Sequence, residues 1–170
     1  KVGDRDLVCG QRYGAIGTTK TTIELIDLRF YVSEVHLVRT DGRAVPVALA
    51  QDGIWQHRNV ALVDLEDASG GCRNGTKATH AQVTGMVPAG DYRGLRFTLG
   101  VPVELNHQDP TIAPSPLNLT AMFWNWQGGY KFLKLDFASE GLARAAMSTH
   151  DGHAGHGAAA AATSGFAVHL

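Results

Sequence analysis

Two of the three tryptophans in this chain, Trp124 and Trp126, stand one residue apart in the stretch MFWNWQGGYKF, beside a Gly-Gly pair that predicts a tight turn. Because side chains alternate between the two faces of an extended strand, we expect Met122, Trp124 and Trp126 to share one face. That face is either part of a core, in an aromatic cluster with residues across the turn, or an exposed platform on which sugar rings stack.

Eight histidines beside only two cysteines suggest a metal held by imidazole, which suits copper, zinc, iron and nickel. Strand alternation puts His36 on an apolar face with Phe30 and Val32, where a hydrogen-bonded core histidine is the commoner alternative to a ligand. His107 stands where an apolar strand meets a proline-rich loop, a position at which sites are often built. His169 alternates with apolar residues one position before the last residue.

A second group of histidines, His150, His153 and His156, lies in a Gly/Ala-rich stretch at residues 148–165. Such composition predicts a mobile, low-complexity loop. Loose binding of a divalent ion would require this loop to be ordered, at a cost in conformational entropy, so we favour a solvated linker.

Several classes of protein are disfavoured by the sequence. Fifteen Lys and Arg against sixteen Asp and Glu give a net charge of −1, which offers no electrostatic footprint for nucleic acid or an anionic membrane. No apolar run approaches the roughly 20 residues of a membrane span. Motifs of serine hydrolases, zinc proteases, P-loop enzymes and dinucleotide-binding folds are missing, and no His-x-His supports copper chemistry of the superoxide dismutase type.

The two cysteines, Cys9 and Cys72, lie in Gly-rich polar stretches that predict loops. A disulfide between them indicates an oxidising compartment, whereas the alternative of two free thiols would favour buried positions. The chain begins at Lys1 rather than Met, which we take as a sign that a leader has been removed.

Short alternating or apolar runs separated by Gly, Pro, Asn and Asp predict an all-β fold, an antiparallel β-sandwich-like single domain over residues 1–170 with long loops. An Asp-Gly turn after residue 39 predicts a hairpin. The expected strands are residues 23–39, 44–50, 59–65, 80–85, 94–105, 120–126 and 130–137. The loop at residues 106–118 contains three prolines, so its backbone is stiff, and it leads into the tryptophan strand.

Four stretches together resemble the MbnP-like family, and the similarity extends from the strand FYVSEVHLV to the C-terminus. Members of this family are periplasmic copper-binding proteins of methanobactin operons, paired with a di-haem enzyme of the MauG/cytochrome c peroxidase type (MbnH-like). The stretches are VPVELNHQDP, PSPLN, MFWNWQGGYKFLKLDF and GFAVHL.

The resemblance implies that Trp124, the first tryptophan of Trp-x-Trp, is oxidised to kynurenine by the di-haem partner and that Cu(I) binding depends on this change. Ring opening exposes an aromatic amine and a ketone, which can donate to a metal where an indole nitrogen cannot. The protein would then be a substrate of the partner and not an enzyme. We expect a periplasmic monomer.

Cu(I) prefers few and relatively soft donors, so two histidines beside kynurenine would suffice. On the resemblance we select His36 and His107, with His169 in reserve and Met122 as a weak thioether neighbour. Trp126 is expected to relay electrons from Trp124 to the haem or to pack beneath Trp124. The competing hypothesis is a carbohydrate-binding or adhesive module that uses both tryptophans as an aromatic platform.

Overall fold

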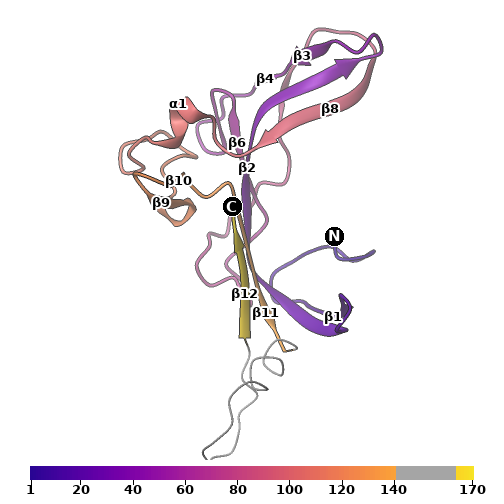
Figure 1. Cartoon of the computed structure of the whole chain (residues 1–170), viewed down its shortest axis with the longest axis vertical. Coiled ribbons are helices and arrows are strands. Elements are labelled where there is room, and N and C mark those ends of the chain that lie inside the picture. The colour runs from indigo at the N-terminus through magenta and orange to yellow at the C-terminus, as the bar shows by residue number, and fades with distance from the viewer. Residues whose placement is uncertain (141–163) are drawn as a thin grey trace, which may run out of the picture. The chain divides into compact units, whose positions relative to one another are not determined.

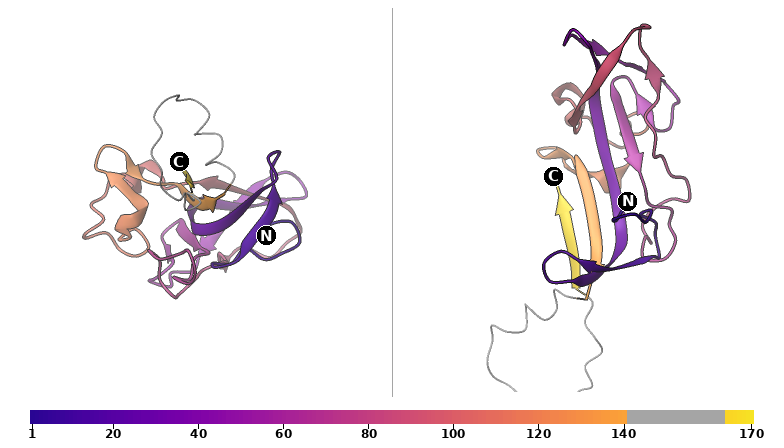
Figure 2. Two further views of the ribbon diagram at one scale, coloured as in Figure 1. Left: turned by 90° about the horizontal axis from the view of Figure 1, so that it is seen from below. Right: turned by 90° about the vertical axis from the view of Figure 1, so that its right-hand side faces the viewer.

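The computed structural model describes residues 1–140 and 164–170, in which antiparallel strands dominate (Figure 1, Figure 2). Strands make up 44% of the described residues and helices 5%, which confirms the all-β class. The chain divides into two compact units. Unit 1 consists of residues 1–28, 66–77 and 135–168, and unit 2 of residues 29–65, 78–134 and 169–170. No helix in the described ranges is long and apolar enough to cross a membrane.

The longest strand, β2 (Thr21–Arg39), runs from unit 1 into unit 2. Its β-branched and aromatic residues favour extended backbone. In unit 2 it pairs antiparallel with β6 (Val60–Asp64), β8 (Tyr92–Leu99) and β3 (Ala44–Pro46). The turn into β3 contains Gly42 at φ +91°, which confirms the predicted Asp-Gly hairpin.

Because of a bulge in β2, His36 lies on the opposite face of the strand from the one predicted. Glu34 has φ +52°, and the register with β8 shifts between Ser33 and His36. Because one extra residue moves all later side chains to the opposite face, Val35 joins Val32 in one apolar cluster. His36 therefore does not share the face of Val32, and the predicted alternation through residue 36 is wrong.

The core of unit 2 lies on both faces of β6, whose residues are all buried. Val60 and Leu62 pack into one cluster with Tyr31 and Tyr130, while Ala61 and Val63 pack into the other. Alternate residues of one strand thus serve two cores, which explains why β6 is apolar from Val60 to Val63.

The remaining elements are short, and several differ from the predicted strands. Residues 94–105 end in a helix instead of continuing as a strand, and residues 120–122 form a 3₁₀ turn. The elements are β1 (Arg12–Ile16), β4 (Ala48–Leu49), β5 (Gln56–His57), β7 (Gly85–Met86), α1 (Val103–Asn106), η1 (Thr120–Met122), β9 (Phe123–Asn125), β10 (Gly129–Tyr130), β11 (Leu133–Ser139) and β12 (Ser164–His169).

In unit 1 the Cys9–Cys72 disulfide is present, as predicted, with Cα atoms 5.9 Å apart. Tyr13 of β1 is fully buried, and its hydroxyl donates to the carbonyl oxygen of Asp6. The predicted mobile loop at residues 148–165 lies outside the described residues, except for Ser164 and Gly165, which begin β12.

Candidate functional site

The tryptophan stretch forms a tight hairpin in unit 2, made of β9, a turn at residues 126–128 and β10. The side chain of Asn125 shapes the turn, because its Oδ1 accepts the backbone N–H groups of Gln127 at 2.9 Å and Gly128 at 2.8 Å. Trp124 lies on β9, whereas Trp126 lies in the turn. The predicted alternation therefore stops after Asn125.

Both tryptophans are exposed, Trp124 by 52% and Trp126 by 74%. Of the two alternatives for this face, the core aromatic cluster is therefore wrong for both side chains. The cluster exists with the neighbouring residues instead: the ring of Tyr130 meets Phe123 at 5.0 Å and Tyr31 at 5.7 Å, both edge to face.

Met122 does not share a face with the tryptophans, contrary to the prediction. It ends the 3₁₀ turn η1, not a strand, and its side chain is fully buried in the core cluster with Tyr130. The strand alternation that suggested it as a thioether neighbour of Trp124 is not present.

Two side chains lie against the ring of Trp124. The Nζ of Lys131 is 4.8 Å from the ring centroid and also donates to the carbonyl oxygen of Ala121 at 3.0 Å. The imidazole of His169 is 5.5 Å from the Trp124 ring, centroid to centroid, and tilted by 57°. Trp124 therefore has a cation and an imidazole as immediate neighbours.

Strand pairing at the end of the chain brings His169 to the hairpin. The backbone N–H of Leu170 donates to the carbonyl of Leu133 at 3.0 Å, and the carbonyl of Leu170 accepts the N–H groups of Phe132 and Leu133. Phe132 and Leu133, which follow β10, are thus hydrogen-bonded to Leu170, the residue after His169. These bonds join residues 37 and 38 positions apart in sequence, so no local sequence pattern predicts them.

His107 contacts the second tryptophan. Its Nδ1 lies 3.1 Å from the carbonyl oxygen of Trp126, and since a carbonyl only accepts, Nδ1 carries the hydrogen. The lone pair is then on Nε2. A histidine whose other ring nitrogen donates to a backbone carbonyl has the usual arrangement of a metal ligand. The side chain is exposed.

Asn106, the last residue of α1, anchors the loop of His107 to the hairpin. Its Oδ1 accepts the backbone N–H of Tyr130 at 2.9 Å. A Cβ on Gly129 would come within 2.4 Å of the Asn106 Nδ2, so the close approach requires glycine there. The sequence prediction did not select this asparagine. Two features of the sequence could have indicated its role: its position just before His107, and the Gly-Gly pair of the hairpin, which permits a close approach.

His36 is the selected histidine that the structure does not bring into contact with the hairpin. Its Nδ1 donates to the carbonyl of Glu34 in its own strand, and β2 places it opposite Pro46 of β3 and Arg96 of β8. Beyond the bulge it lies on the face of β2 that also carries Tyr31, which contacts the hairpin residue Tyr130.

The hydroxyls beneath the hairpin remain neutral over the physiological range. Burial, followed by the nearby charge of Asp109, raises the pKa of Tyr130 to about 12, and burial raises the pKa of Tyr31 as well. Their hydroxyls donate to the carbonyls of Leu117 at 2.6 Å and Pro116 at 3.0 Å. These tyrosines support the hairpin and offer no anionic donor to a metal.

The unmodified side chains do not form a complete metal site. Among the described residues, no group of three or more His, Cys, Asp or Glu is arranged to hold an ion. His107 and His169 each lie beside one tryptophan of the hairpin. A metal at this position needs a further donor, which an unmodified indole does not supply.

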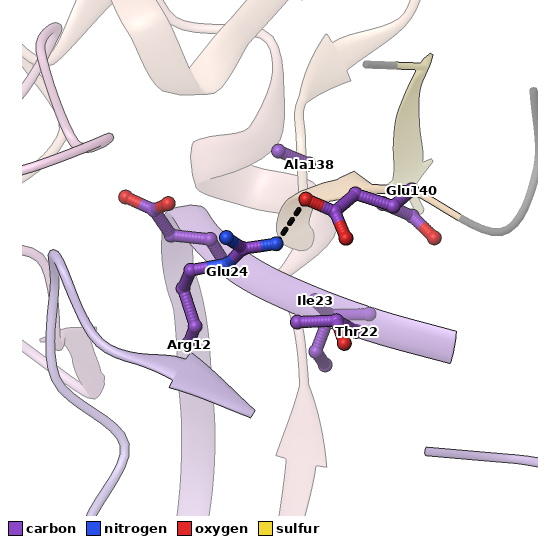
Figure 3. Close-up of a pocket in the computed structure, with 7 residues that line it drawn as sticks. Arg12, Thr22, Ile23, Glu24, Ala138 and Glu140 are labelled. Atoms are coloured by element: carbon purple, nitrogen blue, oxygen red, sulfur yellow. Dashed lines mark hydrogen bonds and ion pairs between the residues drawn. The ribbon is translucent and has the colours of Figure 1, made fainter. Parts of the chain in front are cut away.

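Two concave regions involve other residues. In unit 2 an apolar cavity of about 330 Å³ is lined by valines and by Leu95 and Phe97 of β8. In unit 1 a polar one of about 220 Å³ is lined by Arg12, Glu24 and Glu140, among others, and Figure 3 shows the Arg12 guanidinium directed at the Glu140 carboxylate, with which it pairs.

Comparison with known proteins identifies a family. The family model described as MbnP matches residues 1–170. A solved structure, MbnP from Methylosinus trichosporium, superposes with a TM-score of 0.66 at 32% identity, over 81% of this chain and 51% of that one. The chain thus spans about half the length of this relative. No curated protein matches the chain significantly.

Proposed function

Since the chain belongs to the MbnP family, we propose that it is a periplasmic Cu(I)-binding protein of copper homeostasis, with a site completed by oxidation of Trp124 to kynurenine. In this proposal the oxidation is catalysed by a di-haem partner of the MauG/cytochrome c peroxidase type. The protein is the substrate of that enzyme and has no catalytic role itself.

The observation that carries the proposal is the setting of Trp124, half exposed on a short hairpin with the imidazole of His169 against its ring. A buried tryptophan would be shielded from an oxidising partner. An isolated surface tryptophan would yield a single weak donor after oxidation. Trp124 combines access from outside with a nitrogen ligand already beside it.

The chemistry can be written with its atoms balanced. Two oxygen atoms from peroxide enter at C2 and C3 of the indole as the bond between them breaks, and two peroxides are reduced to water. The product, N-formylkynurenine, is hydrolysed to formate and kynurenine. The aryl amine and aryl ketone of kynurenine are then the donor groups that the original side chain lacked.

The chain offers two imidazoles to accompany this new donor. The Nδ1–H of His107 donates to the carbonyl of Trp126, which leaves the lone pair on Nε2 available to a metal. The imidazole of His169 lies against Trp124. Cu(I) would be held by these borderline nitrogen donors in a low-coordinate site. His36 is the weaker candidate, because its contacts are with its own strand.

Trp126 suits the role of relay in this scheme. It is the more exposed of the two tryptophans and is separated from Trp124 by one residue. An electron leaving Trp124 for a haem that does not touch it would pass through the neighbouring indole. Modification by the partner should therefore slow in Trp126→Phe, and an unchanged rate would remove the relay.

The periplasmic location is supported by the Cys9–Cys72 disulfide, since such bonds persist in oxidising compartments. The described residues also contain no helix that could span a membrane.

Mass spectrometry of the protein produced with and without its di-haem partner tests the proposal, together with copper analysis of both samples. Conversion to kynurenine exchanges one carbon for one oxygen and adds about 4 Da to the peptide that contains Trp124. We expect this shift at Trp124 only with the partner, accompanied by copper. Unmodified tryptophan and no copper in both samples would refute the proposal.

Histidine variants of the modified protein identify the ligands. We expect His107→Ala and His169→Ala each to lower copper affinity about tenfold or more, as loss of a metal ligand or its support does. His57→Ala, on β5 of the same unit, is the matched control and should bind normally. Full copper stoichiometry and affinity in the His107→Ala, His169→Ala double variant would show that the ligands lie elsewhere.

The exposed indoles also fit a sugar-binding platform, which is the alternative function. Trp126 at 74% exposure has the access that ring stacking needs. Trp124 fits less well because Lys131 and His169 lie against its ring. Tryptophan fluorescence that responds to oligosaccharides but not to copper, in a protein with unmodified Trp124, would favour this alternative.

A further inference from the structure

The contact between Lys131 and Trp124 distinguishes the two tryptophans of the hairpin. Lys131 is held in place at both ends: its backbone N–H donates to the carbonyl of Met122 at 2.8 Å, and its Nζ donates to the carbonyl of Ala121 at 3.0 Å. The Nζ lies 4.8 Å from the centroid of the Trp124 ring. The ammonium is therefore a fixed charge beside this indole.

A fixed cation at this distance opposes removal of an electron from the ring. The neutral indole attracts the ammonium through its electron-rich face. The radical cation formed by loss of one electron carries a positive charge and repels it. Both effects raise the oxidation potential of Trp124 relative to the same side chain in water.

Trp126 lacks this neighbour. Of the cation–ring contacts found in the described residues, the one in the hairpin involves Trp124 alone. Trp126 is also 74% exposed, so water can stabilise positive charge on its ring. Two indoles one residue apart thus have different electrostatic surroundings.

We propose that Lys131 determines which tryptophan of the pair reacts with oxidants other than the partner: it protects Trp124 against them and leaves Trp126 as the more oxidisable site. This inference rests on the proposed function, in which Trp124 is the future copper ligand and Trp126 the relay. Stray oxidation of Trp124 to hydroxylated products would destroy the ligand, so its protection until the partner acts preserves the site.

The test uses the isolated protein and a preformed ruthenium(III) polypyridyl complex, added in the dark as a stoichiometric one-electron oxidant in air. The oxidant takes one electron and returns to ruthenium(II), the indole radical cation loses its N–H proton to water, and dissolved oxygen adds to the radical. Peptide mass spectrometry then measures oxygenated products at Trp124 and Trp126. In the wild-type protein the products should lie mainly on Trp126.

Replacement of the charge should redistribute the products. In Lys131→Met, which keeps the length of the side chain, we expect the ratio of Trp124 to Trp126 products to rise about tenfold. Lys131→Arg keeps the charge and should retain the wild-type ratio. Lys20→Met, in a turn of unit 1, is the matched control for loss of a lysine and should change nothing.

Salt separates an electrostatic effect from altered packing. Because Trp124 is half exposed, raising the ionic strength from low to high should screen Lys131 and increase the Trp124 share in the wild-type protein. The ratio in Lys131→Met should be independent of salt. A change in exposure alone would not produce this difference.

The outcomes for the two proposals are distinct. An unchanged ratio in Lys131→Met, or an equal rise in Lys131→Arg, overturns the role of Lys131 and leaves the copper proposal untouched. If the ratio shifts as expected but the di-haem partner never forms kynurenine on the wild-type protein, the role of Lys131 stands and the proposed function fails.

Discussion

At the scale of single residues, the hairpin depends on a glycine that no other residue can replace. Gly129 has φ +73°, and a Cβ there would lie 2.4 Å from the Nδ2 and 2.5 Å from the carbonyl oxygen of Asn106. Asn106 in turn holds the backbone of Tyr130 and precedes His107. Loss of this close approach would displace the candidate ligand together with the hairpin.

We predict that Gly129→Ala lowers the free energy of unfolding by about 3 kcal/mol or more and weakens copper binding to the modified protein. Gly53→Ala is the control, because Gly53 also has φ +73° but nothing lies within 4 Å of its added Cβ. The free energy of unfolding of this control variant should fall by only about 1 kcal/mol, because its backbone is strained at a positive φ. Equal losses in urea denaturation would contradict the role of Asn106.

At the scale of elements, a single carboxylate organises the loop before β5. Asp52 Oδ1 accepts the backbone N–H groups of Ile54 at 2.9 Å, Trp55 at 2.7 Å and Gln56 at 3.0 Å. Desolvation raises its pKa, but these three bonds and the nearby His80 outweigh it and hold the pKa below 3.8. The loop therefore gains stability from the ionised form.

We predict that Asp52→Ala destabilises unit 2 by about 1–2 kcal/mol, since three N–H groups lose their acceptor. Asp52→Asn keeps a neutral acceptor and should lose less. With a lowered folded-state pKa, the contribution is present above pH 3.8 and lost as the pH falls through the folded value. Acid titration of thermal stability should show this component in the wild-type protein and not in Asp52→Asn.

The bulge in β2 also acts at this scale. By inserting one residue at Glu34, it lets the same strand present Val32 and Val35 to one apolar cluster. The side chain of His36 is thereby turned out of that cluster. Without the bulge, the carboxylate of residue 34 and an imidazole would take the places of Val35 and Leu37 in the lining of the apolar cavity.

At the scale of the whole molecule, the two units are stabilised in different ways. Unit 2 has two apolar clusters around β6, whereas few of the residues that the structure describes in unit 1 are buried and apolar, among them Tyr13, Leu25 and Cys72. Small cores commonly rely on disulfides. Cys9–Cys72, which joins positions 63 residues apart, is such a constraint on unit 1.

We predict that reduction of this disulfide, or the Cys9→Ser, Cys72→Ser double variant, destabilises unit 1 by about 2–4 kcal/mol. Hydrogen exchange should accelerate in β1 and at residues 66–77 much more than in β6 of unit 2. Reductant added to the double variant is the control and should have no further effect. Uniform acceleration throughout both units would show that they unfold together.

Sequence alone determined the features that depend on local chemistry. Alternation and turn residues predicted an all-β chain and the hairpin after residue 39, and the loop setting of Cys9 and Cys72 predicted their disulfide. The motif around Trp124 and Trp126 identified the family. Each of these signals is carried by neighbouring residues or by a short, specific motif.

Only the tertiary structure decided which side chains meet. Strand alternation was predicted to continue through Glu34 and from Met122 to Trp126, and both predictions are wrong. A bulge interrupts the first strand and a 3₁₀ turn replaces the start of the second, because both features are set by packing against distant strands. The contact of His169 with Trp124 depends on pairing between Leu133 and the end of the chain. Pairing over such separations leaves no periodic trace in the sequence, so the immediate surroundings of Trp124 emerge only from the fold.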